Sequence, residues 1–161
     1  MNLSEEDREF ISGIAVFGGL MGQALDHVCE RMRVKEVEAG ELLMREAEPG
    51  HEMFVVRKGA VEVFKTAGAG EMRLALLKPG ACFGEMALID IQPRSAGVRT
   101  LEPSTIWSLD HADLASLWKA DGQAFTLVVM NIAREISRRL RRADRLLAAI
   151  HRFVAGLDVE G

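Results

Sequence analysis

The chain has 161 residues, of which 48% are hydrophobic and 27% charged, and this composition is typical of one soluble globular domain. No apolar run approaches the roughly 18–20 residues that span a bilayer. The N-terminus is acidic, the reverse of a secretory or transit segment. We therefore expect a cytoplasmic protein with no membrane contact.

Cysteine and histidine usage indicates neither a redox site nor a metal site. Cys29 and Cys82 are far apart, form no CxxC motif, and are expected to be buried small apolar residues. The four histidines show no ligand spacing. We therefore expect no metal, and we see no base and nucleophile of the kind that an enzyme would need.

Charge is unevenly distributed along the chain. The net charge of −4 argues against nucleic acid as the main partner. Residues 123–152, however, hold seven arginines against Glu135 and Asp144, so that this segment is +5 and the rest of the chain −9. Such asymmetry indicates either a functional surface or, more commonly, a solvated helix face.

The first part of the chain predicts helices. Ser4, with Asp7 three residues later, is a suitable N-terminal cap. Apolar residues then follow at helical spacing up to Phe17. Gly18-Gly19 interrupts the pattern, which resumes from Met21 to Met32.

The middle of the chain, from about Val34 to Asp110, predicts short strands. Runs rich in Val, Leu and Phe are separated by Gly or Pro-Gly about every ten residues, which is typical of a sandwich or barrel. Strands are expected at 53–56, 61–64, 73–77 and 105–109. Lys58-Gly59 joins two of these runs closely enough to predict a hairpin.

The last part predicts helices again. Asp110 is a plausible cap for a first helix, which Asp121-Gly122 ends. A long helix of about 30 residues follows from about Gln123 to Val154, and it would span about 45 Å.

The apolar stripe of this long helix exceeds what one small barrel can cover. Its members step by threes and fours: Phe125, Val129, Ile132, Ile136, Leu140, Ala143, Leu147 and Ile150. We expect part of the stripe to pair with a twin helix in a homodimer. The alternative is that the stripe folds back on the N-terminal helices.

The segment 83–98, FGEMALIDIQPRSAGV, carries the chemistry. Gly84 permits close backbone approach, and residues 85–88 can form one short helical turn whose free amides would face an anion. Arg94 follows among small residues, and its planar, permanently charged donors suit a phosphate. Glu85 would be repelled by that phosphate unless it serves another group, such as a sugar hydroxyl. The combination therefore indicates a phosphate already joined to a ribose.

This segment resembles the phosphate-binding cassette of the cyclic-nucleotide-binding domain family. The family pattern is Phe-Gly-Glu, an apolar residue, Ala or Gly, Leu, a variable stretch, then Arg, a small residue and Ala, and each element is present. Further matches are Phe17-Gly18-Gly19-Leu20, Gly40-Glu41, Glu48-Pro49-Gly50, Val56-Arg57-Lys58-Gly59 and Leu77-Lys78-Pro79-Gly80. The resemblance covers roughly Phe10 to Leu147.

The resemblance implies an α+β fold, with an antiparallel β-roll or jelly-roll barrel between N-terminal helices and a long C-terminal helix. It implies one domain over 1–155, comprising helices at 1–32, the β-roll at 33–110 with the cassette at 83–98, and helices at 111–155. Residues 156–161 would form a tail.

The resemblance also implies roles for individual residues. Glu85 would accept a hydrogen bond from the ribose 2′-hydroxyl, and Arg94 would pair with an exocyclic oxygen of the cyclic phosphate. Phe83 and Gly84 open the cassette. The phosphate shell would be completed by the amides of Met86, Ala87 and Ala96 with the Ser95 hydroxyl, while Val63, Leu74 and Leu77 would wall the sugar and base. Arg139 is expected to approach Glu85 when the long helix packs down.

The base is left open between cyclic AMP and cyclic GMP. Where bacterial relatives place hydroxyl residues that bind adenine, this chain has Ala143 and Asp144. A carboxylate can accept from the adenine amino group, and it also matches two adjacent donors of guanine, while Ser95 can contact a syn guanine. The alternative is that Asp144 is an exposed residue that pairs with arginines.

The resemblance implies a regulatory sensor, not an enzyme, that binds cyclic AMP or cyclic GMP and signals to an unknown partner protein as the C-terminal helix moves. About ten residues follow Ile150, which is too few for a helix-turn-helix, so we do not expect sequence-specific DNA binding. The alternatives are a ligand-free domain that serves as a dimerisation or protein-interaction module and, less favoured, a regulator whose arginine-rich helix binds nucleic acid nonspecifically.

Overall fold

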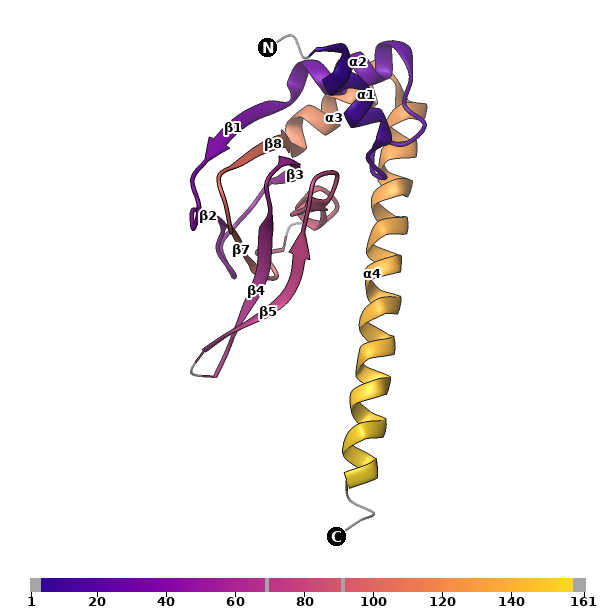
Figure 1. Cartoon of the computed structure of the whole chain (residues 1–161). Coiled ribbons are helices and arrows are strands. Elements are labelled where there is room, and N and C mark those ends of the chain that lie inside the picture. The colour runs from indigo at the N-terminus through magenta and orange to yellow at the C-terminus, as the bar shows by residue number, and fades with distance from the viewer. Residues whose placement is uncertain (1–3, 69, 91, 158–161) are drawn as a thin grey trace.

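Two antiparallel sheets, each of four strands, form the centre of the computed structural model, which describes residues 4–68, 70–90 and 92–157 (Figure 1). One sheet has the order β1-β8-β3-β6 and the other β2-β7-β4-β5. The strands are β1 Arg33–Val37, β2 Leu42–Met44, β3 Glu52–Lys58, β4 Val61–Ala67, β5 Gly70–Leu77, β6 Cys82–Phe83, β7 Gly97–Thr100 and β8 Ser104–Asp110. The predicted antiparallel β-roll is thereby confirmed.

Helices precede and follow the sheets. They are α1 Glu5–Gly13, α2 Gly22–Arg31, the short 3₁₀ helix η1 Glu85–Leu88, α3 His111–Ala120 and α4 Gly122–Leu157. Figure 1 shows α1, α2 and α3 gathered at one end of the roll, from which α4 extends alongside it. With the sheets, they give the predicted α+β fold and its long C-terminal helix.

The helix ends follow the capping residues that the sequence contains. Ser4 and Asp7 form a reciprocal capping box at α1, and Asp110 with Asp113 forms another at α3. The Asp121 side chain accepts from the first amides of α4. The first helix, however, ends at Gly13 rather than at Gly18-Gly19, and the chain turns from there to α2.

The predicted hairpin at Lys58-Gly59 is wrong. The flanking strands β3 and β4 belong to different sheets, so this tight turn carries the chain from one sheet to the other. Gly59 has φ +87° and lies directly against Ser104, leaving no room for a side chain. The hairpin in this region is β4–β5, closed near Gly68.

The core has two parts. The larger packs the helices against the β1-β8-β3-β6 sheet around Phe17, Met53 and Trp107, and the smaller lies between the sheets around Val56, Val61 and Ile106. Both cysteines are buried, as predicted, and burial raises the pKa of the Cys82 thiol to about 12.

The long helix α4 divides into a packed half and an exposed half. Ala124, Val128 and Ile132 are buried in the larger core, and Phe125 and Ile136 pack against it. Beyond Arg139, the large apolar side chains of α4 are half or more exposed: Leu140, Leu146, Leu147, Ile150, Phe153 and Val154. The helix continues to Leu157, so the first two residues of the predicted tail are helical, while 158–161 lie outside the described residues.

Candidate functional site

A cavity of about 270 Å³ lies between η1, the segment that follows it, and the inner face of the β2-β7-β4-β5 sheet. Its lining residues are Met44, Val63, Phe83, Gly84, Glu85, Met86, Ala87, Asp90, Gln92, Pro93, Arg94, Ser95, Ala96, Val98 and Arg139. The cavity therefore combines an apolar wall with a small number of charged side chains, as ligand sites commonly do.

Gly84 sets the turn that leads into the site. Its φ of +72° is in the left-handed region, and η1 begins with the next residue, as the sequence predicts. A Cβ at this position would lie 2.7 Å from Nη1 of Arg94 and 3.1 Å from the carbonyl oxygen of Glu52. Only glycine therefore fits between the strand and the guanidinium.

Arg94 supplies a buried positive charge to the site. It is 8% exposed, and Nη1 donates to the carbonyl oxygen of Gly84 at 3.1 Å. Within the described part of the chain, no carboxylate lies within ion-pair distance of it, and burial lowers the pKa of the guanidinium. Because an unpaired buried charge is costly, this environment favours an anionic ligand.

The backbone around Arg94 is fixed by the loop that precedes β3. The Arg94 amide donates to the carbonyl oxygen of Glu48 at 2.9 Å, and its carbonyl oxygen accepts from Ala47 at 2.9 Å. Gly50, in the same loop, packs so closely on the guanidinium that no Cβ fits between them. The side chain is therefore held in place before any ligand arrives.

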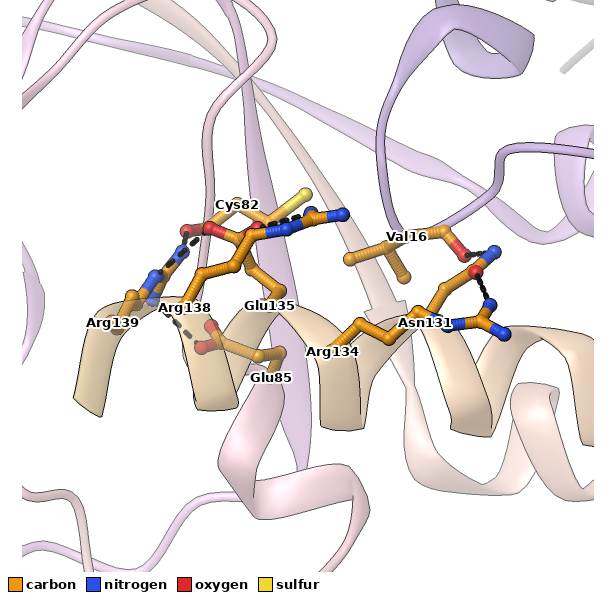
Figure 2. A network of polar contacts seen from close by, with 8 residues as sticks. All are labelled: Val16, Cys82, Glu85, Asn131, Arg134, Glu135, Arg138 and Arg139. Carbon is orange, nitrogen blue, oxygen red and sulfur yellow. Dashed lines mark hydrogen bonds and ion pairs between the residues drawn. The ribbon is translucent and has the colours of Figure 1, made fainter. Parts of the chain in front are cut away.

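Glu85 is the second charged group of the site. It is 2% exposed, Oε1 accepts from Nη1 of Arg139 at 2.7 Å, and Oε2 has no hydrogen-bond partner among the residues described (Figure 2). Burial raises the pKa of this carboxyl, while Arg139 opposes the rise. Oε2 is thus an acceptor that a ligand hydroxyl can satisfy.

Arg139 joins the site to α4, as predicted. Besides Glu85, it donates through Nη2 to the carbonyl oxygen of Cys82 at 2.6 Å and through Nε to Glu135 at 3.3 Å (Figure 2). About two turns before it, Asn131 donates to the carbonyl oxygens of Val16 and Gly18. The helix is therefore tied to the N-terminal segment at one point and to the cassette at the other.

Most of the residues predicted from the sequence meet in this cavity. They are Val63, Phe83, Gly84, Glu85, Met86, Ala87, Arg94, Ser95, Ala96 and Arg139. The Ala87 amide already donates to the carbonyl oxygen of Gly84 at 3.2 Å, so its place in a phosphate shell stays a prediction.

Leu74, Leu77 and Asp144 do not line the cavity. Leu74 is 50% exposed and lies where the pairing of β4 with β5 shifts register, between the pairs Val63↔Ala75 and Phe64↔Arg73. Leu77 packs at the edge of the smaller core, and Asp144 is exposed on α4. In the single chain, these three side chains lie outside the cavity, and their contact with a nucleotide stays a prediction.

The structure adds lining residues that the sequence argument did not assign. Four of them lie within the cassette, so their proximity to the motif could have indicated that they line the site: Asp90, Gln92, Pro93 and Val98. Met44 comes from β2, far away along the chain, and no motif marks it.

The described ranges contain neither a metal-ligand cluster nor a helix that could span a membrane. No group of three His, Cys, Asp or Glu side chains there is arranged to hold a metal ion, so no residue of this site is assigned to one. No helix in those ranges combines the length and apolar character that a membrane span requires.

Comparison with known proteins assigns the domain. The family model described as "Cyclic nucleotide-binding domain" matches residues 34–121. The chain is 32% identical to "Cyclic AMP receptor protein" of Thermus thermophilus over 135 residues, which is 83% of this chain and 61% of that protein.

Solved structures agree with the family model. A cyclic nucleotide-binding domain from Methylobacillus flagellatus superposes with a TM-score of 0.80 at 26% identity, covering 88% of this chain and 83% of that one. The regulatory domain of Toxoplasma gondii PKA, crystallised with cAMP, gives a TM-score of 0.66 at 27% identity, covering 72% of this chain and 46% of that one. The chain spans about three fifths of the Thermus protein. On its sequence match and its fold, this chain belongs to the cyclic nucleotide-binding domain family.

Proposed function

We propose that this chain is a regulatory sensor that binds cyclic AMP or cyclic GMP in the cavity between η1 and the sheet. The observation that carries the proposal is that two buried charged side chains, each with bonding capacity left over for a ligand, line the same cavity. Among the described residues, Arg94 has no carboxylate within ion-pair distance, and Oε2 of Glu85 has no hydrogen-bond partner. A cyclic nucleotide offers an anion and a hydroxyl on one rigid ring system, so one ligand completes both.

The phosphate and the ribose hydroxyl of such a ligand each have a counterpart in the cavity. Arg94 pairs with the exocyclic phosphate oxygens, and Oε2 of Glu85 accepts from the ribose 2′-hydroxyl. Val63, Val98 and Met44 provide the apolar wall for the sugar and base. Binding rather than turnover is the function that these groups support.

Cyclic AMP is the favoured ligand of the two. Two of the relatives carry it in their descriptions, one as "Cyclic AMP receptor protein" and one as a regulatory domain with cAMP. Asp144 is exposed in the single chain, and the residue that reads the base is therefore not assigned.

We further propose that the signal leaves through α4. Arg139 bonds both Glu85 and the Cys82 carbonyl oxygen, so a hydroxyl that donates to Glu85 changes the contact that holds the helix. A ligand shifts an equilibrium only when it interacts differently with the two states, and this contact provides such a difference. The exposed half of α4 is the surface offered to a second copy in a homodimer and to an unknown downstream protein.

A comparison of binding between a complete ligand and a ligand analogue tests the role of Glu85. The wild-type chain is titrated with cyclic AMP and with 2′-deoxy cyclic AMP, and it should bind the complete nucleotide about 10- to 100-fold more tightly, since a hydrogen bond to a charged group contributes about 1.5–3 kcal/mol. In Glu85→Gln this discrimination should shrink. Glu38→Gln, at an exposed position outside the cavity, should keep it. Equal binding of both nucleotides by the wild-type chain would contradict the assignment.

Hydrogen exchange tests the movement of α4. Saturating cyclic nucleotide should change the exchange of amides around Glu135 and Arg139, and Arg139→Ala should remove most of that change. Unchanged exchange throughout α4 at saturation would overturn the helix as the output, although not the nucleotide site.

A further inference from the structure

The side of α4 that faces away from its apolar residues carries a stripe of arginines. Each arginine stands two residues before an apolar side chain, and two residues turn about 200° around a helix, so the arginines and the apolar residues lie on opposite sides. The apolar side chains in question are Ile136, Leu140, Ala143, Leu147 and Val154. The arginine stripe, all of it exposed, comprises Arg134, Arg138, Arg141, Arg145 and Arg152.

Little acidic charge lies near the arginine stripe. Residues 123–157 contain two acidic side chains, Glu135 and Asp144, and each is one residue, or about 100° of helix, away from the nearest member of the stripe. Among the described residues, Glu135 pairs with Arg138 at 3.2 Å. From Arg141 onward, the stripe has no carboxylate within ion-pair distance in the described part of the chain. A partner can therefore meet most of this positive charge without displacing an internal ion pair.

The acidic part of the chain lies at the other end of the helix. The first turn of α1 is acidic, and Figure 1 shows α1 and α2 beside the start of α4, which runs away from them. The 23 residues from Gly122 to Arg145 span about 35 Å, several times the Debye length of about 8 Å at physiological ionic strength. The net negative charge of the chain therefore does not repel an anion from the stripe.

A long, continuous anion matches the stripe. Its five positive charges are spread over about 27 Å, from Arg134 to Arg152. Each strand of duplex DNA carries a phosphate about every 3.4 Å along the axis, so its charge is continuous over that length. Residues 123–157 hold seven arginines and no lysine, and the planar guanidinium can bind a phosphate through two parallel hydrogen bonds.

A membrane surface matches the helix less well. A helix that lies on a membrane inserts its apolar face between the lipids. In α4 the arginines are opposite that face, and Ile132 and Ile136 of the apolar face already pack in and against the larger core. The apolar side and the arginine side of α4 therefore cannot both contact one bilayer.

We propose that the arginine stripe of α4 binds the phosphate backbone of double-stranded DNA without reading its base sequence. Contacts to phosphates position a protein on DNA and carry no sequence information. The major groove of B-DNA is about 12 Å wide and admits an α-helix beside the phosphates, whereas the major groove of an RNA duplex is too narrow. This binding is separate from the cyclic nucleotide site, because no member of the stripe lines that cavity.

Fluorescence anisotropy with a labelled 20-base-pair DNA duplex of arbitrary sequence tests the surface. Five phosphate contacts give a slope of log affinity against log salt of about −4.5, so the wild-type chain should lose affinity about 500-fold between 50 and 200 mM salt. Arg141→Gln combined with Arg145→Gln should reduce the slope by about 1.8 and weaken binding at 50 mM salt at least about tenfold. Lys58→Gln combined with Lys78→Gln is the matched control, because it removes the same charge at two exposed positions away from α4 and should change neither quantity.

Three competitors decide between kinds of partner. An RNA duplex of the same length, a polyglutamate peptide and vesicles containing phosphatidylserine should each bind more weakly than the DNA duplex at equal charge concentration. Tighter binding of any of them would overturn the proposal. So would a wild-type chain that does not bind the duplex at 50 mM salt, or equal losses of affinity in the two double variants.

Cyclic nucleotide titration keeps this proposal distinct from the proposed function. The double variant of the stripe should bind cyclic nucleotide as the wild type does, which also shows that its domain is folded. Duplex binding with the predicted salt slope by a wild-type chain that binds neither cyclic nucleotide would refute the proposed function and leave the arginine stripe standing.

Discussion

Substitution of Gly50 gives the most specific test of how the loop before β3 positions the Arg94 guanidinium. A Cβ at Gly50 would overlap the guanidinium of Arg94 and would lie 2.7 Å from its Nη2. Nε and Cζ of Arg94 lie closer still, so restoring an ordinary separation of about 3.5 Å requires the guanidinium to shift by well over about 0.8 Å. Gly50→Ala therefore moves the phosphate-binding group without removing it.

The expected cost follows from the strength of one charged hydrogen bond. Such a bond contributes about 1.5–3 kcal/mol, so Gly50→Ala should weaken cyclic nucleotide binding about 10- to 100-fold. The fold should tolerate the change, because φ at Gly50 is not in the left-handed region and the clashing atoms belong to a movable side chain. The free energy of unfolding should stay within about 1 kcal/mol of wild type.

Calorimetric titration and urea unfolding, performed on the same preparations, separate the two effects. Gly13→Ala is the control, since its Cβ meets nothing within 4 Å and its φ is also ordinary. Wild-type affinity in Gly50→Ala would refute the claim that the loop before β3 fixes Arg94 for the phosphate. A large loss of stability would refute the claim that only the guanidinium has to move.

Three further predictions concern stability and reactivity. Ile132 is 0% exposed, so Ile132→Ala should lower the free energy of unfolding by about 2–5 kcal/mol. Leu147 is 65% exposed, so Leu147→Ala should change it by less than about 0.5 kcal/mol in dilute monomer. Equal losses of stability in urea unfolding would contradict the division of α4 into a packed and an exposed half. The arginines beside Glu62 lower the pKa of its carboxyl, so its stabilising effect is present above the ordinary pKa of glutamate and is lost as the pH falls through the lowered value. Glu62→Gln should therefore be less stable than wild type at pH 7, by a margin that shrinks as the pH falls through the lowered pKa, and a difference independent of pH would contradict this. Because the pKa of the Cys82 thiol is about 12 and Cys82 is buried, this thiol should react with Ellman's reagent at pH 8 only after unfolding; rapid reaction of the native chain would contradict the packing.

The parts of the fold that local patterns determine were predictable from the sequence. The caps at Ser4 and Asp110 rely on a side chain and an amide two or three residues apart, and both are present. The turn at Gly84 and the short helix after it also depend on adjacent residues. These features lie within a few residues of one another, so the sequence alone carries the information.

Features that depend on distant strands were not predictable in the same way. Lys58-Gly59 has the length of a hairpin turn, but only the pairing of β3 with β8 and of β4 with β7 shows that the chain changes sheets there. The register shift at Leu74 likewise depends on how two strands align. Met44 reaches the cavity through the pairing of β2 with β7, which no local motif records.

Calorimetric titration with cyclic AMP and cyclic GMP, on the wild-type chain and on Arg94→Ala, tests the central claim most directly. The wild-type chain should bind at least one nucleotide saturably, and Arg94→Ala should lose about 100-fold or more in affinity, because the phosphate then enters a buried site without the cation that pairs with it. A folded wild-type chain that binds neither nucleotide, or that binds one with the same affinity after Arg94→Ala, would contradict it.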